Sequence, residues 1–317
     1  MDFEKNQELE ILVDLSRTGK VKPWRDKAEA TRVLAEVYRL INRSKSLRLE
    51  QCASFLDYAV SVNGEKRLIN ANFCRVRLCP MCVWRRTLKI FGQTSKIMDE
   101  LSKSDEYAYV FLTLTMKNCE TGSLSEAVDK MMNAWHKFVG YRAFKHAVKG
   151  FYRGFEVTHN LDCESDSYGT FHPHFHCILA VKKAYFKSRC YLNQDDWTKL
   201  WMKALGVNYN PVVYVKKIKG NTAKAVAEIA KYAVKQGDYI IPENLGLMLD
   251  TVKILDIALA NRRFVSFGGV FKEVHKKLNL DDPENGNLIY VDNEADLPDY
   301  KLVTYIWHSG YRQYIKS

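Results

Sequence analysis

The stretch from residue 170 to residue 181 reads TFHPHFHCILAV and places three histidines at a spacing of two. Alternate side chains of an extended chain share a face, so His172, His174 and His176 point one way while Phe171 and Phe175 point into a core. Surface histidines, or core histidines satisfied by the backbone, are the competing explanation. Three imidazoles on one strand face are typical of metal sites, so the stretch predicts a strand that carries metal ligands.

The segments before the histidines predict neighbouring strands. Residues 107–115, YAYVFLTLT, are β-branched and aromatic, which favours a central strand. A second strand over 150–159 contains Glu156, and a ten-residue polar loop joins it to the histidine strand. Strands joined in this way are usually antiparallel neighbours, which brings Glu156 beside the histidines. Two imidazoles and a carboxylate suit Mn²⁺ or Mg²⁺, whereas an ordinary surface ion pair is the alternative role for Glu156.

The rest of the chain alternates between helical and extended patterns. Helices are predicted at 27–49, 124–138, 195–205, 223–235 and 250–263, and further strands at 212–215 and 301–307. In the helix over 223–235, Glu228 and Tyr232 are four residues apart and share a face, with Lys235 three residues beyond. A carboxylate beside a phenol among several lysines suggests chemistry on phosphate.

Four cysteines form the next cluster of interest. Cys79 and Cys82 make a Cys-Pro-Met-Cys turn, and Cys52 and Cys74 precede it closely enough to complete a four-sulfur zinc site. A redox Cys-x-x-Cys is the competing interpretation, but no thioredoxin-like strand and helix pattern surrounds the pair. The spacing therefore predicts structural Zn²⁺.

Basic and aromatic residues surround these cysteines and recur later in the chain. They offer phosphate contacts and a stacking surface, and we expect them to bind DNA: Arg75, Arg77, Trp84, Arg85, Arg86, Lys89, Lys216, Lys217 and Lys219. The net charge of +11 over 317 residues agrees with a nucleic-acid partner, although charge alone leaves an acidic protein or a membrane surface open.

Bulk composition bounds the class of protein. An apolar content of 47% is ample for a core, no apolar run is long enough to cross a bilayer, and the N-terminus lacks the pattern of a secretion signal. We expect a cytoplasmic protein. From 281 to 299 the chain has seven acids and no lysine or arginine, which indicates an exposed acidic loop.

Taken together, these motifs resemble those of a known family. His174-Phe175-His176 matches the histidine-hydrophobic-histidine (HUH) motif, and residues 111–115 resemble the first motif of the same endonucleases. Glu228 and Tyr232 resemble their single-tyrosine catalytic helix. Together with the cysteine block, the order of motifs over about residues 50 to 275 is similar to that of rolling-circle plasmid replication initiators of Gram-positive bacteria.

The resemblance implies an α+β protein with the HUH-endonuclease fold, a central antiparallel sheet flanked by helices. It implies a helical, DNA-binding region with a four-cysteine zinc site at 1–105, the endonuclease domain at 106–245, and a C-terminal extension with the acidic loop at 246–317. The implied activity is that of a metal-dependent, site-specific single-strand DNA endonuclease and strand transferase. Such an enzyme would nick the double-strand origin through a 5′-phosphotyrosine link and end replication by strand transfer or hydrolysis.

The family's roles transfer to individual residues. Tyr232 would be the nucleophile, Glu228 the base that activates water, and Lys235 a cation beside the phosphate. His174 and His176 would bind the metal, while Glu156 and His172 compete for the third position, with Glu156 preferred.

The implied partners are plasmid origin DNA as a hairpin or cruciform with a single-stranded nick region, and a host helicase. A homodimer is an option and a membrane is not expected. The alternatives are an HUH transposase or relaxase, and a non-catalytic, zinc-containing DNA-binding regulator.

Overall fold

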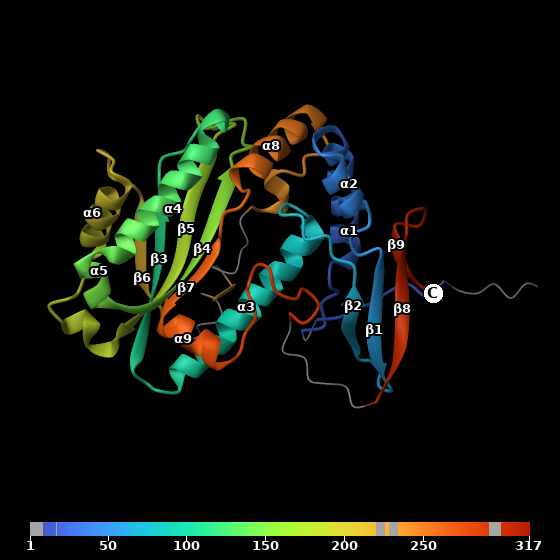
Figure 1. The fold of residues 1–317 in the computed structure, drawn as a ribbon, viewed down its shortest axis with the longest axis horizontal. Helices are drawn as coiled ribbons and strands as arrows, with labels where there is room; N and C mark the ends of the chain where they lie inside the picture. The colour runs from blue at the N-terminus through green and yellow to red at the C-terminus, as the bar shows by residue number, and fades with distance from the viewer. Residues whose placement is uncertain (1–8, 17, 220–225, 228–233, 292–298) are drawn as a thin grey trace, which may run out of the picture. The chain divides into compact units, whose positions relative to one another are not determined.

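The computed structural model describes residues 9–16, 18–219, 226–227, 234–291 and 299–317. The described chain forms two compact units, one comprising residues up to Arg85 together with 287–317 and the other spanning Arg86–Gly286. Both units mix helices with antiparallel sheets (Figure 1), so the predicted α+β class is confirmed. None of the described helices combines the length and apolar composition that a membrane crossing requires.

The first unit is built on a four-stranded antiparallel sheet in the order β2-β1-β8-β9. Its elements are α1 (Trp24–Ile41), α2 (Arg43–Glu50), β1 (Phe55–Ser61), β2 (Lys66–Ala71), β8 (Tyr300–His308) and β9 (Gln313–Lys316). Strand β8 pairs with the whole length of β1, from Tyr300 opposite Ser61 to Ile306 opposite Phe55. The sheet therefore joins segments about 240 residues apart in the sequence.

The second unit is built on a five-stranded antiparallel sheet in the order β6-β3-β5-β4-β7. Its strands are β3 (Tyr107–Thr115), β4 (Val148–His159), β5 (Phe171–Lys182), β6 (Val213–Lys217) and β7 (Val265–Gly269). Its helices are α4 (Leu124–Gly140), α5 (Arg142–Ala147), α6 (Gln194–Leu205), α8 (Leu245–Ala258) and α9 (Val270–Lys277), and α3 (Pro80–Ser102) contributes residues to both units.

One face of the five-stranded sheet forms the core with α4, α5 and α6 (Figure 1). Phe155 of β4 and Phe175 of β5 point to this face, where the ring of Phe175 lies 5.5 Å from that of Trp135 in α4. Trp201 of α6 donates its indole N–H to the carbonyl of Thr115 at 2.7 Å. Because strand side chains alternate, the opposite face receives the three histidines, as the sequence predicted.

Several predicted elements differ from the observed ones. The single helix predicted over 27–49 is wrong, because the chain breaks at Asn42, which is extended and whose side chain accepts a hydrogen bond from the Lys45 amide to begin α2. Strand β7 ends with Phe267, Gly268 and Gly269. Gly269 has a left-handed φ of +52°, and a Cβ there would lie 2.1 Å from the Lys149 carbonyl oxygen.

The predicted domain boundaries, 105/106 and 245/246, do not coincide with those of the two units. The C-terminal segment from 246 divides between them, because β7 pairs with β4 whereas β8 pairs with β1. The helix predicted at 223–235 lies mostly outside the described residues.

Candidate active site

Two histidines of β5 and one carboxylate of β4 meet on the sheet face away from the aromatic core. The register places Glu156 directly opposite His174. Oε2 of Glu156 lies 3.3 Å from Nε2 of His174 and 3.3 Å from Nε2 of His176. The three side chains could together hold a metal ion. Their separation agrees with this, because neighbouring ligands bonded at about 2.1 Å to one ion lie about 3.0 to 3.4 Å apart.

In each of the two imidazole rings Nδ1, the nitrogen that faces away from Glu156, already has a polar partner. Nδ1 of His174 donates to the carbonyl of His172 at 3.0 Å, and Nδ1 of His176 lies 3.2 Å from the hydroxyl of Thr113 in β3. A neutral His174 bonded in this way carries its lone pair on Nε2, which faces a carboxylate oxygen. Two facing acceptors require either a proton or a cation between them, and a divalent ion fits this donor set.

Glu156 is 3% exposed. Burial favours a raised pKa for its carboxyl group, but the hydrogen bonds and positive charge of His174 and His176 outweigh burial and hold the pKa well below its usual range. Its second oxygen, Oε1, lies 3.6 Å from Nζ of Lys235. The carboxylate is therefore ionised, and an exposed cation stands at the edge of the cluster.

His172 lies beside the cluster but does not join it. Its Nδ1 lies 2.7 Å from Oδ1 of Asn118, whose amide N–H₂ donates to the Thr170 hydroxyl at 2.8 Å. That chain of donors assigns the proton to Nδ1 of His172 and leaves Nε2 as an acceptor. Among the described side chains the group around these histidines that could hold a metal ion comprises Glu156, His174 and His176, which favours Glu156 over His172 as third ligand.

The other residues predicted to act in catalysis are only partly placed. Tyr232 and Glu228 lie outside the described residues. Lys235, which follows Tyr232 by three positions in the sequence, is described and reaches Glu156. Lys216 and Lys217 are exposed on the edge strand β6, and Lys219 is exposed just beyond it.

The four predicted cysteines meet in the first unit. Sγ of Cys52 lies 3.6 Å from that of Cys79 and 3.7 Å from that of Cys82, and the sulfurs of Cys74 and Cys82 are also 3.7 Å apart. A disulfide would be about 2.05 Å long, whereas four sulfurs bonded at about 2.3 Å to a tetrahedral ion lie about 3.8 Å apart. The geometry thus fits one metal ion held by all four.

Backbone amides support these sulfurs. The amide of Arg75 donates to Sγ of Cys82 at 3.2 Å. The amide of Cys74 donates to Sγ of Cys52, and the amide of Val76 donates to Sγ of Cys74, each at 3.4 Å. Arg75 has a φ of +59°, a left-handed conformation rare outside glycine, and it turns the successive amides toward the sulfurs. N–H donors stabilise thiolates, the form of cysteine that binds metal.

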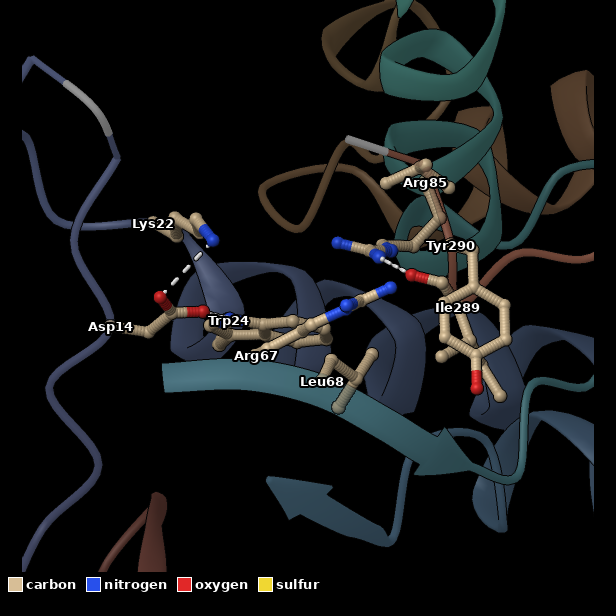
Figure 2. Close-up of a pocket in the computed structure, with 9 residues that line it drawn as sticks. Asp14, Lys22, Trp24, Arg67, Leu68, Arg85, Ile289 and Tyr290 are labelled. Atoms are coloured by element: carbon tan, nitrogen blue, oxygen red, sulfur yellow. Dashed lines mark hydrogen bonds and ion pairs between the residues drawn. The ribbon is translucent and has the colours of Figure 1, made fainter. Parts of the chain in front are cut away.

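Three of the basic residues predicted to contact DNA are buried: Arg85, Arg86 and Lys89. In the first unit, Arg85 donates to the carbonyls of Leu288 and Ile289 at 2.9 and 2.7 Å, beside a small cavity that Lys22 and Arg67 also line (Figure 2).

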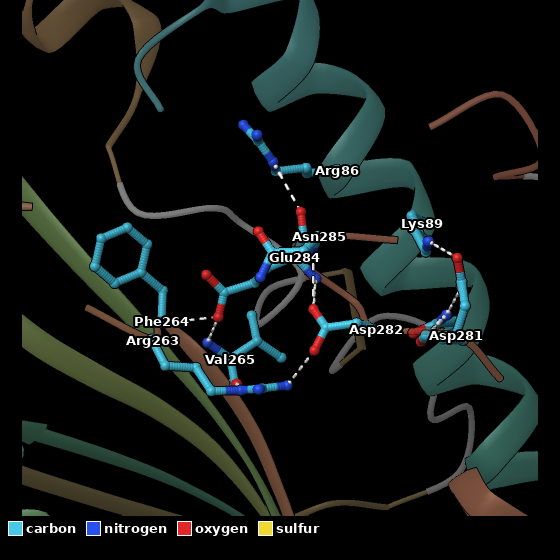
Figure 3. Close-up of polar contacts among 10 residues, drawn as sticks. Arg86, Lys89, Arg263, Phe264, Val265, Asp281, Asp282, Glu284 and Asn285 are labelled. Atoms are coloured by element: carbon cyan, nitrogen blue, oxygen red, sulfur yellow. Dashed lines mark hydrogen bonds and ion pairs between the residues drawn. The ribbon is translucent and has the colours of Figure 1, made fainter. Parts of the chain in front are cut away.

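In the second unit, Arg86 and Lys89 are held by the acidic segment. Arg86 donates to the Glu284 carbonyl at 3.2 Å, and Lys89 bonds the carboxylate of Asp281 (Figure 3). The acidic stretch is therefore not exposed along its whole length, since Glu284 is 4% exposed. Buried cations that are already bonded to the protein's own acceptors are poor phosphate ligands, so a direct DNA contact by Arg85, Arg86 or Lys89 finds no support.

The remaining members of that predicted set are more accessible. Arg75 is exposed and Arg77 is half-buried. Trp84 is also half-buried, but its ring packs edge-on against Trp24 at 4.7 Å, which gives it a packing role within the first unit.

Comparison with known proteins gives the family. The model of a family described as "Replication protein" matches residues 65–315. The chain belongs to this replication-protein family. A "Protein rep" of Bacillus amyloliquefaciens is 35% identical, with 99% of each chain covered, and one of Streptococcus pneumoniae serotype 2 is 34% identical, with 99% of this chain and 98% of the relative covered. No solved structure matches.

Sequence reasoning missed several residues that shape the site of this replication protein. Thr113 and Asn118 orient imidazoles. Thr113 lies within the 111–115 motif, but its contact with His176 follows from the pairing of β3 with β5, and Asn118, which lies beyond β3, belongs to none of the motifs. Asp238, whose backbone carbonyl lies 3.2 Å from Nδ1 of His159, follows the segment 223–235 in the sequence.

Proposed function

We propose that this replication protein initiates rolling-circle replication of a plasmid by nicking one strand of the origin. The observation that carries the proposal is the cluster of His174, His176 and Glu156, with both Nε2 atoms turned to one carboxylate, in a chain of this family. A divalent ion such as Mn²⁺ or Mg²⁺ would fit between these groups, where it supplies Lewis-acid activation of the scissile phosphate. A Zn²⁺ ion would fit the four cysteines and brace the first unit.

The chain's own residues then divide the chemistry. The Tyr232 oxygen attacks the scissile phosphorus, a phosphotyrosine bond to the 5′ end forms, and the 3′ oxygen leaves as the primer hydroxyl. A phenol with an ordinary pKa near 10 needs an activated phosphate or a base at neutral pH. Lys235, already within 3.6 Å of Glu156, would offset negative charge on the phosphate.

Glu228 would act in the last step of the replication cycle. A carboxylate can take a proton from water, so that water rather than a second tyrosine cleaves the final phosphodiester bond and the strand is released by hydrolysis. Strand transfer back to the 3′ hydroxyl is the other outcome of the same link. Unwinding of the plasmid would fall to a host helicase, and origin DNA is the macromolecular partner we propose.

The test is covalent capture of DNA. The protein is incubated with a labelled oligonucleotide from its plasmid origin, folded as a hairpin, and Mn²⁺, and adducts are resolved by denaturing electrophoresis. We expect an adduct with the wild-type protein and with the exposed-tyrosine control Tyr168→Phe, and none with Tyr232→Phe or His174→Ala. Tight binding without any adduct in the wild-type protein would favour the non-catalytic DNA-binding regulator.

A second variant separates the roles of the two residues. Glu228→Ala should form the adduct at a normal rate but accumulate it, because hydrolytic release is blocked. If Glu228→Ala abolishes nicking itself, Glu228 serves the tyrosine or the metal instead.

A further inference from the structure

Two aromatic rings continue the histidine face of the sheet toward its edge. Phe111 of β3 lies beside His176, with ring centroids 5.8 Å apart, and Tyr214 of β6 lies beside Phe111, with centroids 6.5 Å apart. The register explains this row, since Thr113 pairs with both His176 and Tyr214, and Phe111 pairs with Lys216. The face that carries the candidate metal ligands therefore also carries Phe111, Thr113, Tyr214 and Lys216.

Tyr214 is not part of the core. Its neighbour Val213 points to the opposite face and is 4% exposed, whereas Tyr214 is 47% exposed and stands on an edge strand. Lys216, two residues further on the same face, is also exposed. The row thus runs from the imidazoles through a half-buried ring to an exposed ring with an ammonium group beside it.

We infer that Phe111 and Tyr214 form a subsite for unpaired nucleobases of single-stranded DNA next to the scissile phosphate. The inference deepens the proposed nicking function and rests on it for the identity of the strand. Aromatic rings bind bases by stacking whatever their sequence, while cations hold the backbone, and this face offers both within a short distance of the metal ligands. Duplex DNA hides the faces of its bases, so the subsite selects melted DNA.

The experiment measures binding without cleavage. Fluorescence anisotropy without added Mn²⁺ or Mg²⁺ gives the Kd of the full-length protein for a fluorescein-labelled 20-nucleotide oligothymidylate and for a strand of equal length in which every base is replaced by an abasic site. Wild-type protein should bind the thymidylate at least about tenfold more tightly, because stacking is worth that much or more per base. Equal affinity for the two strands would overturn the inference without any variant.

Variants at Tyr214 test whether its ring causes the preference for the strand with bases. Tyr214→Ala should weaken thymidylate binding about tenfold and leave abasic-strand binding unchanged, and Tyr214→Phe should stay within about twofold of wild type on both. Lys216→Ala is the matched control, because loss of a charge weakens both strands alike. Tyr300→Ala, an exposed tyrosine of the other unit, should change neither.

Contrary outcomes are equally clear. If Tyr214→Ala loses affinity for both strands equally, or for neither, the ring is not a base-stacking site. Because no metal and no bond cleavage are involved, failure of the covalent-adduct experiment would refute the nicking chemistry and leave this measurement standing.

Discussion

At the scale of single residues, Glu156 and His172 are the two candidates for the third ligand of the candidate metal site. Glu156 faces both Nε2 atoms, while His172 lies outside the group of side chains that could hold the ion. Glu156→Gln should therefore lower Mn²⁺ affinity at least about tenfold by isothermal titration calorimetry, since an amide is a weaker ligand than a carboxylate. His172→Gln should change it only about twofold, and a larger loss in His172→Gln than in Glu156→Gln would make His172 the ligand.

Asp238 should make the free energy of unfolding depend on pH. Burial raises the pKa of Asp238 from its ordinary value to about 6, and Oδ2 has no hydrogen-bond partner among the described residues. Between about pH 4 and pH 6 the folded state holds a proton that the unfolded state releases, so this group lowers stability as pH rises through that window. Asp238→Asn should raise the free energy of unfolding by about 1 kcal/mol at pH 7.5, after allowance for partial solvent exposure, with no gain at pH 3.5. Urea denaturation at the two pH values measures both, and a gain of equal size at pH 3.5 would exclude the ionisation of Asp238 as its cause.

At the scale of elements, strand β7 is anchored by one carboxylate of the acidic segment. Oε1 of Glu284 accepts the amides of Phe264 and Val265 at 2.8 and 2.9 Å (Figure 3). Glu284→Ala leaves two buried donors unsatisfied at a cost of about 2 kcal/mol or more, so amide hydrogen exchange over 264–269 should accelerate at least about tenfold. Glu284→Gln keeps an acceptor oxygen and should exchange nearly as slowly as wild type. Unchanged exchange in the alanine variant would show that strand pairing alone holds β7.

Elements with a strong periodic signal could be predicted from the sequence, and those fixed by distant partners could not. The strand over 107–115 matches β3, and alternation along 170–181 placed the histidines and phenylalanines on their correct faces. Strands β1 and β2 have no comparable signal, because β1 gains its central position only by pairing with β8. The burial of the basic residues at 85–89 could not be predicted for the same reason, since their acceptors at 281–289 are about 200 residues away.

The candidate site was predictable to the extent that it follows local spacing. His174, His176, Cys79 and Cys82 come from short motifs, Cys52 and Cys74 were added because they precede the Cys-x-x-Cys motif closely, and Glu156 followed from one hairpin. Thr113 and Tyr214 depend on the lateral order β6-β3-β5, which no short stretch of sequence encodes.

At the scale of the whole molecule, the two units should respond separately to loss of metal. The four cysteines come from the segments around α2, β2 and the start of α3, all in the first unit. A thiol-binding mercurial should release one Zn²⁺ per chain, measured with a colorimetric chelator, and lower the melting temperature of the first unit by about 10 °C or more while the second unit is unchanged. Cys79→Ser should reproduce the effect, and Cys163→Ser, at an exposed cysteine, should not. Purified protein free of zinc would contradict the assignment.

The late position of β8 has a consequence for synthesis on the ribosome. Residues 86–286 contain the whole five-stranded sheet and the candidate metal ligands, so this unit can fold as soon as Gly286 has emerged. The first unit has α1, α2, β1, β2 and the cysteines translated much earlier, but its sheet waits for residues 300–316. A nascent chain therefore holds a complete unit with the candidate metal ligands before the unit with the four-cysteine cluster is complete, and translation of the final strands is the step that makes the two available together.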